Sequence, residues 1–249
     1  MDTKKVYLIG IGPGDPKYLT LEAVEVIKRL NTFLIPLKKG DKEELTRIRK
    51  KVIEFCRPDK NFEIIELEFP ERKKSAFYKE SVEEWRNKKA EMILKVMGRV
   101  NEAGFLVVGD PGLYDGHIEI FKKIQKQIPL EIEVIPGVSS INVLSAKHKI
   151  SLNKIAGTII ITTPRGLRKL KEISSNTVVL LDNYETFRLF KDKKLKIYWG
   201  AYLGTEKEVL FSGWLNECFE KLIEIRRSLK EKYGWIMETY LLTDGREDE

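Results

Sequence analysis

The sequence has few residues of the kinds that hold metals or form disulfides. It contains two cysteines, Cys56 and Cys218, and two histidines, His117 and His148. The cysteines lie far apart and form no CxxC or Cys/His spacing, which predicts two free thiols in a reducing compartment. The histidines and cysteines match no recognised zinc spacing either. We therefore expect no dedicated metal site.

Long apolar runs are missing as well. None approaches the roughly 18 residues that are needed to span a bilayer. The N-terminal run of apolar residues is short, is interrupted by glycine and has no small-residue cleavage site, so it is typical of a strand rather than a signal peptide. With 42% hydrophobic and 33% charged residues, the composition indicates a globular protein. We expect a cytoplasmic protein with no membrane partner.

Positive charge exceeds negative charge, with a net charge of +7. Such an excess favours an anionic partner, which could be nucleic acid, phosphate or a polycarboxylate. The basic residues are scattered, and the sequence has no helix-turn-helix, zinc or RNA-binding sheet signature. A basic nucleic-acid-binding module is therefore the weaker alternative, and we expect no nucleic-acid partner.

Strand-like runs that end in glycine turns alternate with helical segments over the first part of the chain. They include 5–10, 32–36, 104–109 and 131–137. This alternation predicts an α/β fold whose sheet has substantial parallel character. After Ile155 the density of strand-like runs rises, with a long helical segment at 215–234. We therefore expect two α/β domains, residues 1–152 with the glycine-rich loops and residues 153–249.

Three glycine-containing loops follow predicted strands, at 10–20, 109–117 and 135–144. In parallel sheets, ligands collect outside the carboxyl ends of strands. The first loop, GIGPGD, does not fit a dinucleotide site, because its third glycine comes too soon and Pro13 removes a backbone donor. The second strand also ends without an acidic residue, which excludes a nicotinamide-dependent dehydrogenase. Each loop by itself is equally consistent with a tight turn that binds nothing.

The three loops in this order, followed by ITTPRG at 161–166, resemble the tetrapyrrole methylase family of class III methyltransferases. The resemblance extends over nearly the whole chain. It implies two α/β domains that hold S-adenosyl-L-methionine in the cleft between them, usually in a homodimer.

Carried over position by position, the resemblance also implies a set of cofactor-binding residues. They are Pro13, Gly109, Asp110, Leu113, Ser140, Ile141, Leu181, Asp182, Ala201 and Tyr202. Asp110 is equally suited to stabilising a turn, and Ser140 to capping a helix.

Two local segments, WGAYLGT at 199–205 and GWIMETY at 234–240, are similar to one branch of the family. That branch acts in cobalamin biosynthesis, methylates carbon 1 of a precorrin and releases the ring's acetyl group as acetate. Loss of acetate needs a general base and donors for an oxyanion. The candidates are His117, Asp115 and Tyr114, although His117 is as well explained by a surface or capping role.

The substrate implied by this resemblance is a tetrapyrrole with many carboxylates. Arginine pairs bidentately with carboxylates, and the candidates are Arg47, Arg165 and Arg168, with Arg49 and Lys50 beside the first. Each is also explained by a solvated surface position. Other branches stay open: a methylase of another ring carbon, one whose substrate carries cobalt, or the branch that modifies elongation factor two.

Overall fold

The computed structural model describes residues 3–72 and 78–245. Its contacts divide the chain into two compact units, one up to Ser139 and one from Ser140 onward. The sequence places the boundary after residue 152, within the segment that follows helix α5 (Ser140–His148). In the structure α5 belongs to the second unit, because it packs on that unit's strands β8 and β10.

The first unit is built on a five-stranded parallel sheet in the order β3-β2-β4-β1-β5. The strands are β1 (Lys4–Gly10), β2 (Thr32–Pro36), β3 (Glu63–Leu67), β4 (Glu102–Val107) and β5 (Leu130–Ile135). The helices are η1 (Pro16–Tyr18), α1 (Leu21–Arg29), η2 (Gly40–Lys42), α2 (Glu43–Cys56), α3 (Tyr78–Met97) and α4 (His117–Gln125).

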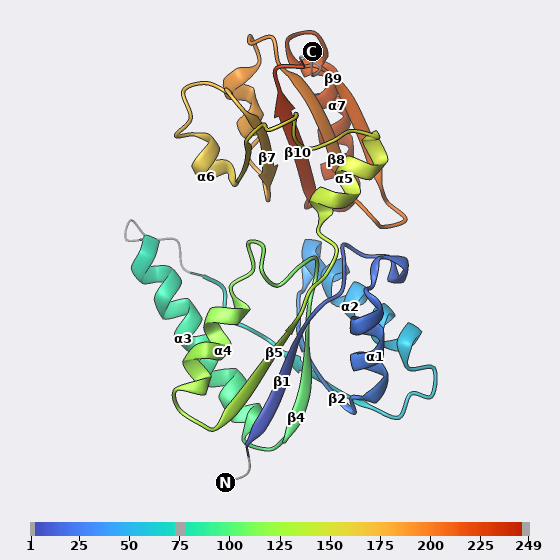
Figure 1. Ribbon diagram of the computed structural model, residues 1–249, viewed down its shortest axis with the longest axis vertical. Helices are drawn as coiled ribbons and strands as arrows, with labels where there is room; N and C mark the ends of the chain where they lie inside the picture. Colours follow the sequence, from blue (N-terminus) through green and yellow to red (C-terminus); the bar gives the residue numbers. More distant parts are fainter. Residues whose placement is uncertain (1–2, 73–77, 246–249) are drawn as a thin grey trace. The chain divides into compact units, whose positions relative to one another are not determined.

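Helices cover both faces of this sheet, with α1 and α2 on one side and α3 and α4 on the other (Figure 1). The alternation of side chains along β1 explains the arrangement. Tyr7 and Ile9 join the core beneath α1 and α2, whereas Val6 and Leu8 join the core beneath α3 and α4. A strand that is buried on both faces has a continuous run of apolar residues, and the run VYLIG at 6–10 has this character. Helix α1 is capped at its start, because the Thr20 side chain accepts from the Ala23 amide at 3.1 Å.

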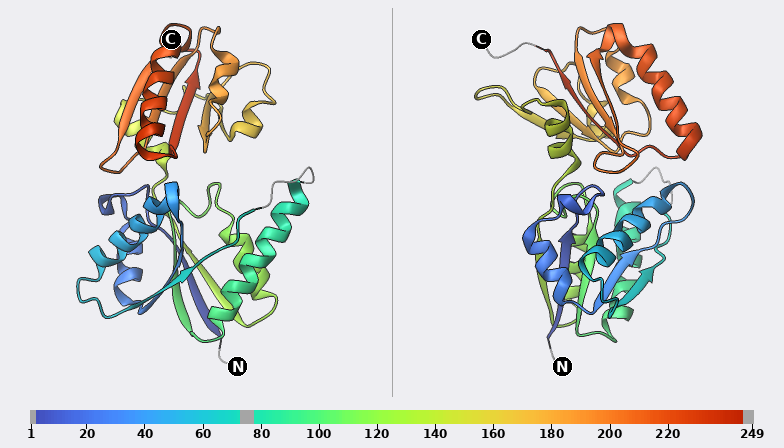
Figure 2. Two further views of the ribbon diagram at one scale, coloured as in Figure 1. Left: turned by 180° about the vertical axis from the view of Figure 1, so that it is seen from behind. Right: turned by 90° about the vertical axis from the view of Figure 1, so that its right-hand side faces the viewer.

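The second unit contains a mixed five-stranded sheet in the order β6-β7-β10-β8-β9. The strands are β6 (Ile159–Thr162), β7 (Asn176–Leu180), β8 (Lys196–Ala201), β9 (Val209–Trp214) and β10 (Glu238–Thr243). Besides α5, the helices are α6 (Pro164–Leu167), η3 (Thr186–Phe190) and α7 (Leu215–Tyr233). Strand β10 runs antiparallel to β7 and β8. Figure 2 shows α7 along one face of the sheet and α5 at the other.

A buried charged network lies under α7. Glu238 accepts from the Arg226 guanidinium at 2.6 and 2.9 Å and from the Trp199 indole N–H at 2.6 Å. Arg226 also pairs with Glu185 at 2.6 Å. Trp199, on β8, is fully buried. Because buried charges need partners, this network ties helix α7 to β8 and β10.

Removing one member of this network should be costly. We expect Glu238→Ala to lower the free energy of unfolding by about 3 kcal/mol, because Arg226 would keep Glu185 but lose its fully buried partner. Urea denaturation followed by circular dichroism measures the change. Glu231→Ala, at an exposed position of the same unit, is the control and should change stability by less than about 0.5 kcal/mol. Equal stabilities of the two variants would contradict the expectation.

Candidate functional site

The first two glycine loops meet at the carboxyl ends of the neighbouring strands β1 and β4. The Gly109 amide donates to the Gly12 carbonyl at 2.8 Å, and the Gly12 amide donates to the Gly109 carbonyl at 3.3 Å. The pair forms a short antiparallel bridge beyond the parallel strands. Both glycines have left-handed φ angles, +70° at Gly12 and +82° at Gly109, which residues with a side chain rarely adopt. The glycines of these loops thus let two backbones cross.

Asp110 joins the third loop to this crossing. Its carboxylate accepts from the Gly112 amide at 2.8 Å and from the Gly137 amide at 2.8 Å. Gly137 in turn lies against Gly10, where an added Cβ would come within 2.8 Å of the Gly10 Cα. Of the two roles the sequence allows for Asp110, stabilisation of the loops is the one that its contacts display.

Open space lies beside this crowded junction. At Gly109 no heavy atom would lie within 4 Å of an added Cβ, so the backbone of the second loop is accessible there. Pro13 is buried and Leu113 is half-buried in the same group of loops. This combination of packed backbone and an uncovered glycine allows a small molecule to approach main-chain groups at the carboxyl edge of the sheet.

The predicted cofactor residues of the second unit follow the ends of its strands. Leu181 comes directly after β7 and Tyr202 directly after β8, and both have left-handed φ angles, +60° and +49°. Strained residues of this kind persist where the surroundings hold them, and they are frequent at functional sites. Leu181 is half exposed, whereas Ala201 and Tyr202 are buried. The Tyr202 hydroxyl donates to the Trp235 carbonyl at 2.6 Å.

Asp182 is fully buried beside Leu181. It accepts from the amides of Tyr184 at 2.9 Å and Thr186 at 2.7 Å, and from the Tyr240 hydroxyl at 2.6 Å. These bonds occupy both carboxylate oxygens, so Asp182 shapes the loop after β7.

Ser140 and Ile141 begin helix α5 in the same unit. The Ser140 hydroxyl pairs with that of Thr239 at 2.9 Å, and Ile141 is buried. Their contacts attach the start of α5 to strand β10.

Two of the three catalytic candidates form a connected chain with a lysine that the sequence analysis missed. The Asp115 carboxylate contacts the Nδ1 atom of His117 at 2.8 Å, and His117 Nε2 lies 3.3 Å from Lys89 Nζ. Lys89 comes from α3 and is only 4% exposed. Its ammonium group lies 3.9 Å from the centre of the Trp85 ring and 4.6 Å from that of Phe69. The i, i+4 spacing of Trp85 and Lys89 is the sequence signal that points to this contact.

Burial and neighbouring charge shift the pKa values of all three groups. Burial lowers the pKa of Lys89 to about 8, with help from the positive charge of Lys38. Burial also lowers the pKa of His117 below its usual value, despite the opposing effect of Asp115. For Asp115, burial acts to raise the pKa, but the hydrogen bonds and charge of His117 outweigh it and the pKa is lowered. Asp115 is therefore ionised and His117 neutral at physiological pH.

Tyr114 lies on the same loop but outside this chain of contacts. Its side chain is 49% exposed, and its φ angle is +53°. The loop from 109 to 117 thus contains an uncovered glycine, a left-handed tyrosine and the Asp115–His117 pair within nine consecutive positions.

The basic residues predicted to bind substrate differ in exposure and in the contacts that they make within their own units. Arg47 is exposed and lies 3.4 Å from Glu43, and Arg165 is exposed on α6. The Arg168 guanidinium lies 5.2 Å from the centre of the Tyr184 ring. Arg49 is buried instead, donating to the carbonyls of Leu106 at 2.9 Å and Leu45 at 2.6 Å, and Lys50 pairs with Glu66 at 2.6 Å.

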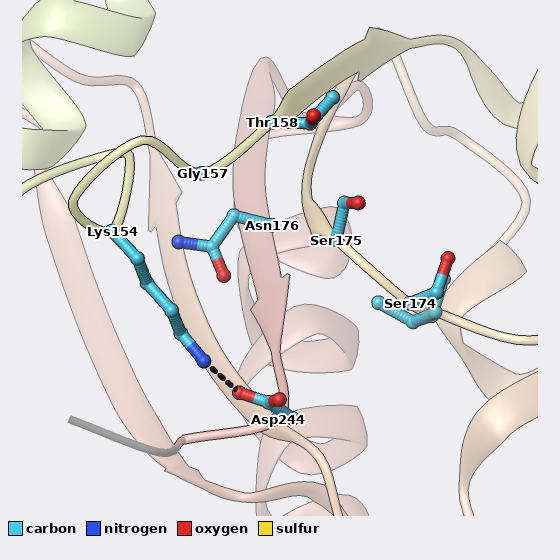
Figure 3. Close-up of a pocket in the computed structure, with 8 residues that line it drawn as sticks. Lys154, Gly157, Thr158, Ser174, Ser175, Asn176 and Asp244 are labelled. Carbon is cyan, nitrogen blue, oxygen red and sulfur yellow. Dashed lines mark hydrogen bonds and ion pairs between the residues drawn. The ribbon is translucent and has the colours of Figure 1, made fainter. Parts of the chain in front are cut away.

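A cavity of about 90 Å³ in the second unit contains none of these candidates. Figure 3 shows its polar lining, in which Lys154 pairs with Asp244 at 2.6 Å. Asn176, at the start of β7, also lines the cavity. The cavity therefore lies at the opposite end of β7 from Leu181. Within residues 3–72 and 78–245, no cluster of three metal-ligating side chains occurs. Over the same residues, no helix has the length and apolar character to cross a membrane.

Comparison with known proteins places this geometry in a family. The model of tetrapyrrole (corrin/porphyrin) methylases matches residues 5–218. A precorrin-6A synthase (deacetylating) of Sinorhizobium sp. is 34% identical over 97% of this chain and 96% of its own length. A cobalt-precorrin-4 C(11)-methyltransferase of Methanocaldococcus jannaschii is 27% identical over 69% of this chain and 57% of its own length.

Solved structures agree in fold. A cobalamin synthesis related protein from Corynebacterium diphtheriae has a TM-score of 0.82 at 29% identity, covering 98% of this chain and 99% of that one. A uroporphyrin-III C-methyltransferase from Thermus thermophilus, solved with S-adenosyl homocysteine, has a TM-score of 0.64 at 20% identity, covering 96% and 92%. The chain belongs to the tetrapyrrole (corrin/porphyrin) methylase family and is an S-adenosyl-L-methionine-dependent methyltransferase.

Proposed function

We propose that this protein is a C-methyltransferase of cobalamin biosynthesis that methylates carbon 1 of a precorrin and releases acetate. The observation that carries the proposal is the similarity to a precorrin-6A synthase (deacetylating), which extends over 97% of the chain at 34% identity. The segments 199–205 and 234–240 support the same branch. In the structure these segments form the end of β8 and the start of β10, which pair with one another.

The glycine loops of the first unit and the strand ends of the second would hold S-adenosyl-L-methionine. The uncovered backbone at Gly109 fits such a ligand, because a side chain there would fill the space that the ligand needs. Pro13, Leu113, Ser140, Ile141, Leu181, Ala201 and Tyr202 complete the proposed contacts. Asp110 and Asp182 would contribute indirectly, because their carboxylates hold the backbone amides of the neighbouring loops in place for the cofactor. When bound, the cofactor supplies the methyl group.

The remaining chemistry belongs to the substrate and to this chain's acid–base groups. A water molecule adds to the acetyl carbonyl and gives up a proton to a base. The bond between the acetyl carbon and the ring then breaks, acetate leaves, and the ring keeps the electron pair that forms the new carbon–methyl bond. Asp115, hydrogen-bonded to His117, would accept the proton, and Tyr114 would donate to the oxyanion.

Arg47, Arg165 and Arg168 would bind the carboxylates of the macrocycle. All three are exposed, so they are accessible to a polycarboxylate ligand. A homodimer is part of the same proposal, and light scattering should give twice the mass of the chain.

A second candidate is a methylase that acts on another carbon of a cobalt-bearing precorrin. Its support is the similarity to the cobalt-precorrin-4 C(11)-methyltransferase, which covers 69% of this chain. Because the proposed cofactor site is common to both candidates, the substrate assay below separates them.

Gly109 gives a test of the cofactor site that does not depend on substrate. We expect Gly109→Ala to weaken binding of S-adenosylhomocysteine at least about tenfold, or about 1.4 kcal/mol, as measured by titration calorimetry. The matched control is Gly40→Ala, since Gly40 also has a left-handed φ of +60° and open surroundings. Both variants carry the same backbone strain, so equal loss of affinity would show that strain and not the site is responsible.

The reaction itself is tested with purified protein, S-adenosyl-L-methionine and a panel of acetyl-bearing precorrins and cobalt-precorrins. We expect S-adenosylhomocysteine and acetate to appear one for one, with ¹³C from a labelled methyl group at carbon 1. Methyl transfer without acetate would favour the second candidate. Absence of methyl transfer to every member of the panel would contradict both.

A further inference from the structure

Lys89, on helix α3 of the first unit, is a buried lysine whose neighbours are two aromatic rings and a histidine. It is 4% exposed and contacts the Trp85 and Phe69 rings and the Nε2 atom of His117. Lysine is almost never fully buried unless it is paired. Here the partner at hydrogen-bond distance is a neutral ring nitrogen, and among the residues that the structure describes no carboxylate bonds directly to the ammonium group.

The two contacts of the imidazole together determine where its proton lies. A protonated lysine can only donate hydrogen bonds, so Nε2 of His117 must accept from Lys89 Nζ at 3.3 Å. An ionised carboxylate can only accept, so Nδ1 must donate to Asp115 at 2.8 Å. Both neighbours require the same neutral form of His117, with its proton on Nδ1.

The exposed end of this chain of groups is the carboxylate. The Asp115 side chain is 21% exposed and that of His117 is 11% exposed. While Lys89 occupies Nε2, that nitrogen cannot accept a proton from a substrate or water. Asp115 is consequently the member of the pair that can meet a reacting group.

Other charged groups act in the same direction as Lys89. Lys38 follows β2, Arg49 lies on α2 and Arg86 on α3, and all three positive charges lower the pKa of Lys89, whereas Asp115 raises it. Arg49 also lowers the pKa of His117. Burial is the largest cause that lowers the pKa of His117, and Lys89, at hydrogen-bond distance from Nε2, adds to it, whereas Asp115 raises that pKa. Removing Lys89 would leave the effect of Asp115 less opposed, and a protonated imidazole paired with Asp115 would weaken the carboxylate as a base.

We propose that Lys89 is a positioning residue of this methyltransferase: it keeps His117 neutral with its proton on Nδ1, so that Asp115 stays an ionised base. The proposal rests on the proposed function only for the identity of the reaction. The state of His117 can be measured on the protein alone.

The chain offers a simple reporter, because it has two histidines. In ¹⁵N-histidine protein we expect His117 to show an acceptor-type Nε2 and a protonated Nδ1. Lys89→Met should raise the titration midpoint of His117 by about one pH unit or more, since a neighbouring positive charge is removed. Lys89→Arg should keep the low midpoint. His148, in the second unit and bonded to the Trp199 carbonyl, is the internal control, and its ring signals should be the same in every variant.

The pH profile of acetate release tests the consequence for the reaction. Wild type should change little between about pH 8 and about pH 6, because its His117 is already neutral. Lys89→Met should lose activity on acidification as His117 becomes protonated, about tenfold for each pH unit below the His117 midpoint measured in that variant, and Lys89→Arg should restore the wild-type profile. Lys88→Met is the matched control on the same helix, since Lys88 is exposed and pairs with Glu84. Unchanged affinity for S-adenosylhomocysteine in each variant confirms that the fold is intact.

Three results would overturn the proposal. The first is a proton on Nε2 of His117 in the wild type. The second is an unchanged His117 midpoint in Lys89→Met. The third is an unchanged pH profile in a variant whose midpoint has moved. If the protein releases acetate from no precorrin, the proposed function fails instead, and the tautomer and midpoint of His117 still decide whether Lys89 fixes the imidazole.

Discussion

The first unit depends on a close approach of backbones at one edge of its sheet. Gly10 and Gly137 lie so near each other that an added Cβ on either would come within 2.8 Å of backbone atoms of the other. That approach brings the third loop within reach of Asp110, whose carboxylate then links the second and third loops. Without this close approach, the loops after β1, β4 and β5 would not be held in contact, and the open space at Gly109 would not be bordered by fixed backbone.

In the second unit, buried carboxylates rather than glycines hold the segments next to the strands in place. Asp182 fixes the loop after β7, and Glu238 fixes Arg226 and Trp199 around β10. The two acids share the core with Tyr240, which donates to Asp182. Because a buried carboxylate needs several donors, each one prescribes the positions of the groups that surround it. Leu181, whose φ angle is +60°, directly precedes Asp182 in the chain.

Local patterns in the sequence were sufficient to predict several strands and the family. The strand-like runs at 5–10 and 32–36 follow from their apolar composition, and strands β1 and β2 confirm them. The family prediction rested on three loops in order, and the comparisons confirm it. The boundary between the units was less accessible, because membership of α5 depends on packing against strands far along the chain.

Contacts between distant residues account for what the sequence did not reveal. Lys89 and His117 are 28 positions apart, and Tyr240 and Asp182 are 58 positions apart. No local period encodes either pair. Arg49 was predicted only as one of several basic residues, whereas its burial against the Leu106 carbonyl comes from the way α2 packs on the sheet. Side-chain chemistry at this site is thus determined by the topology of the sheet as much as by the motifs.

The state of the two cysteines has a practical consequence. Cys56 is buried and Cys218 is half-buried, and burial raises the pKa of both thiols. The thiolate is the form that reacts with electrophiles, so both native cysteines should react slowly with maleimides at neutral pH. One new cysteine on the exposed surface of either unit would therefore accept a fluorescent dye selectively, and the dye would report ligand binding without removal of the native cysteines.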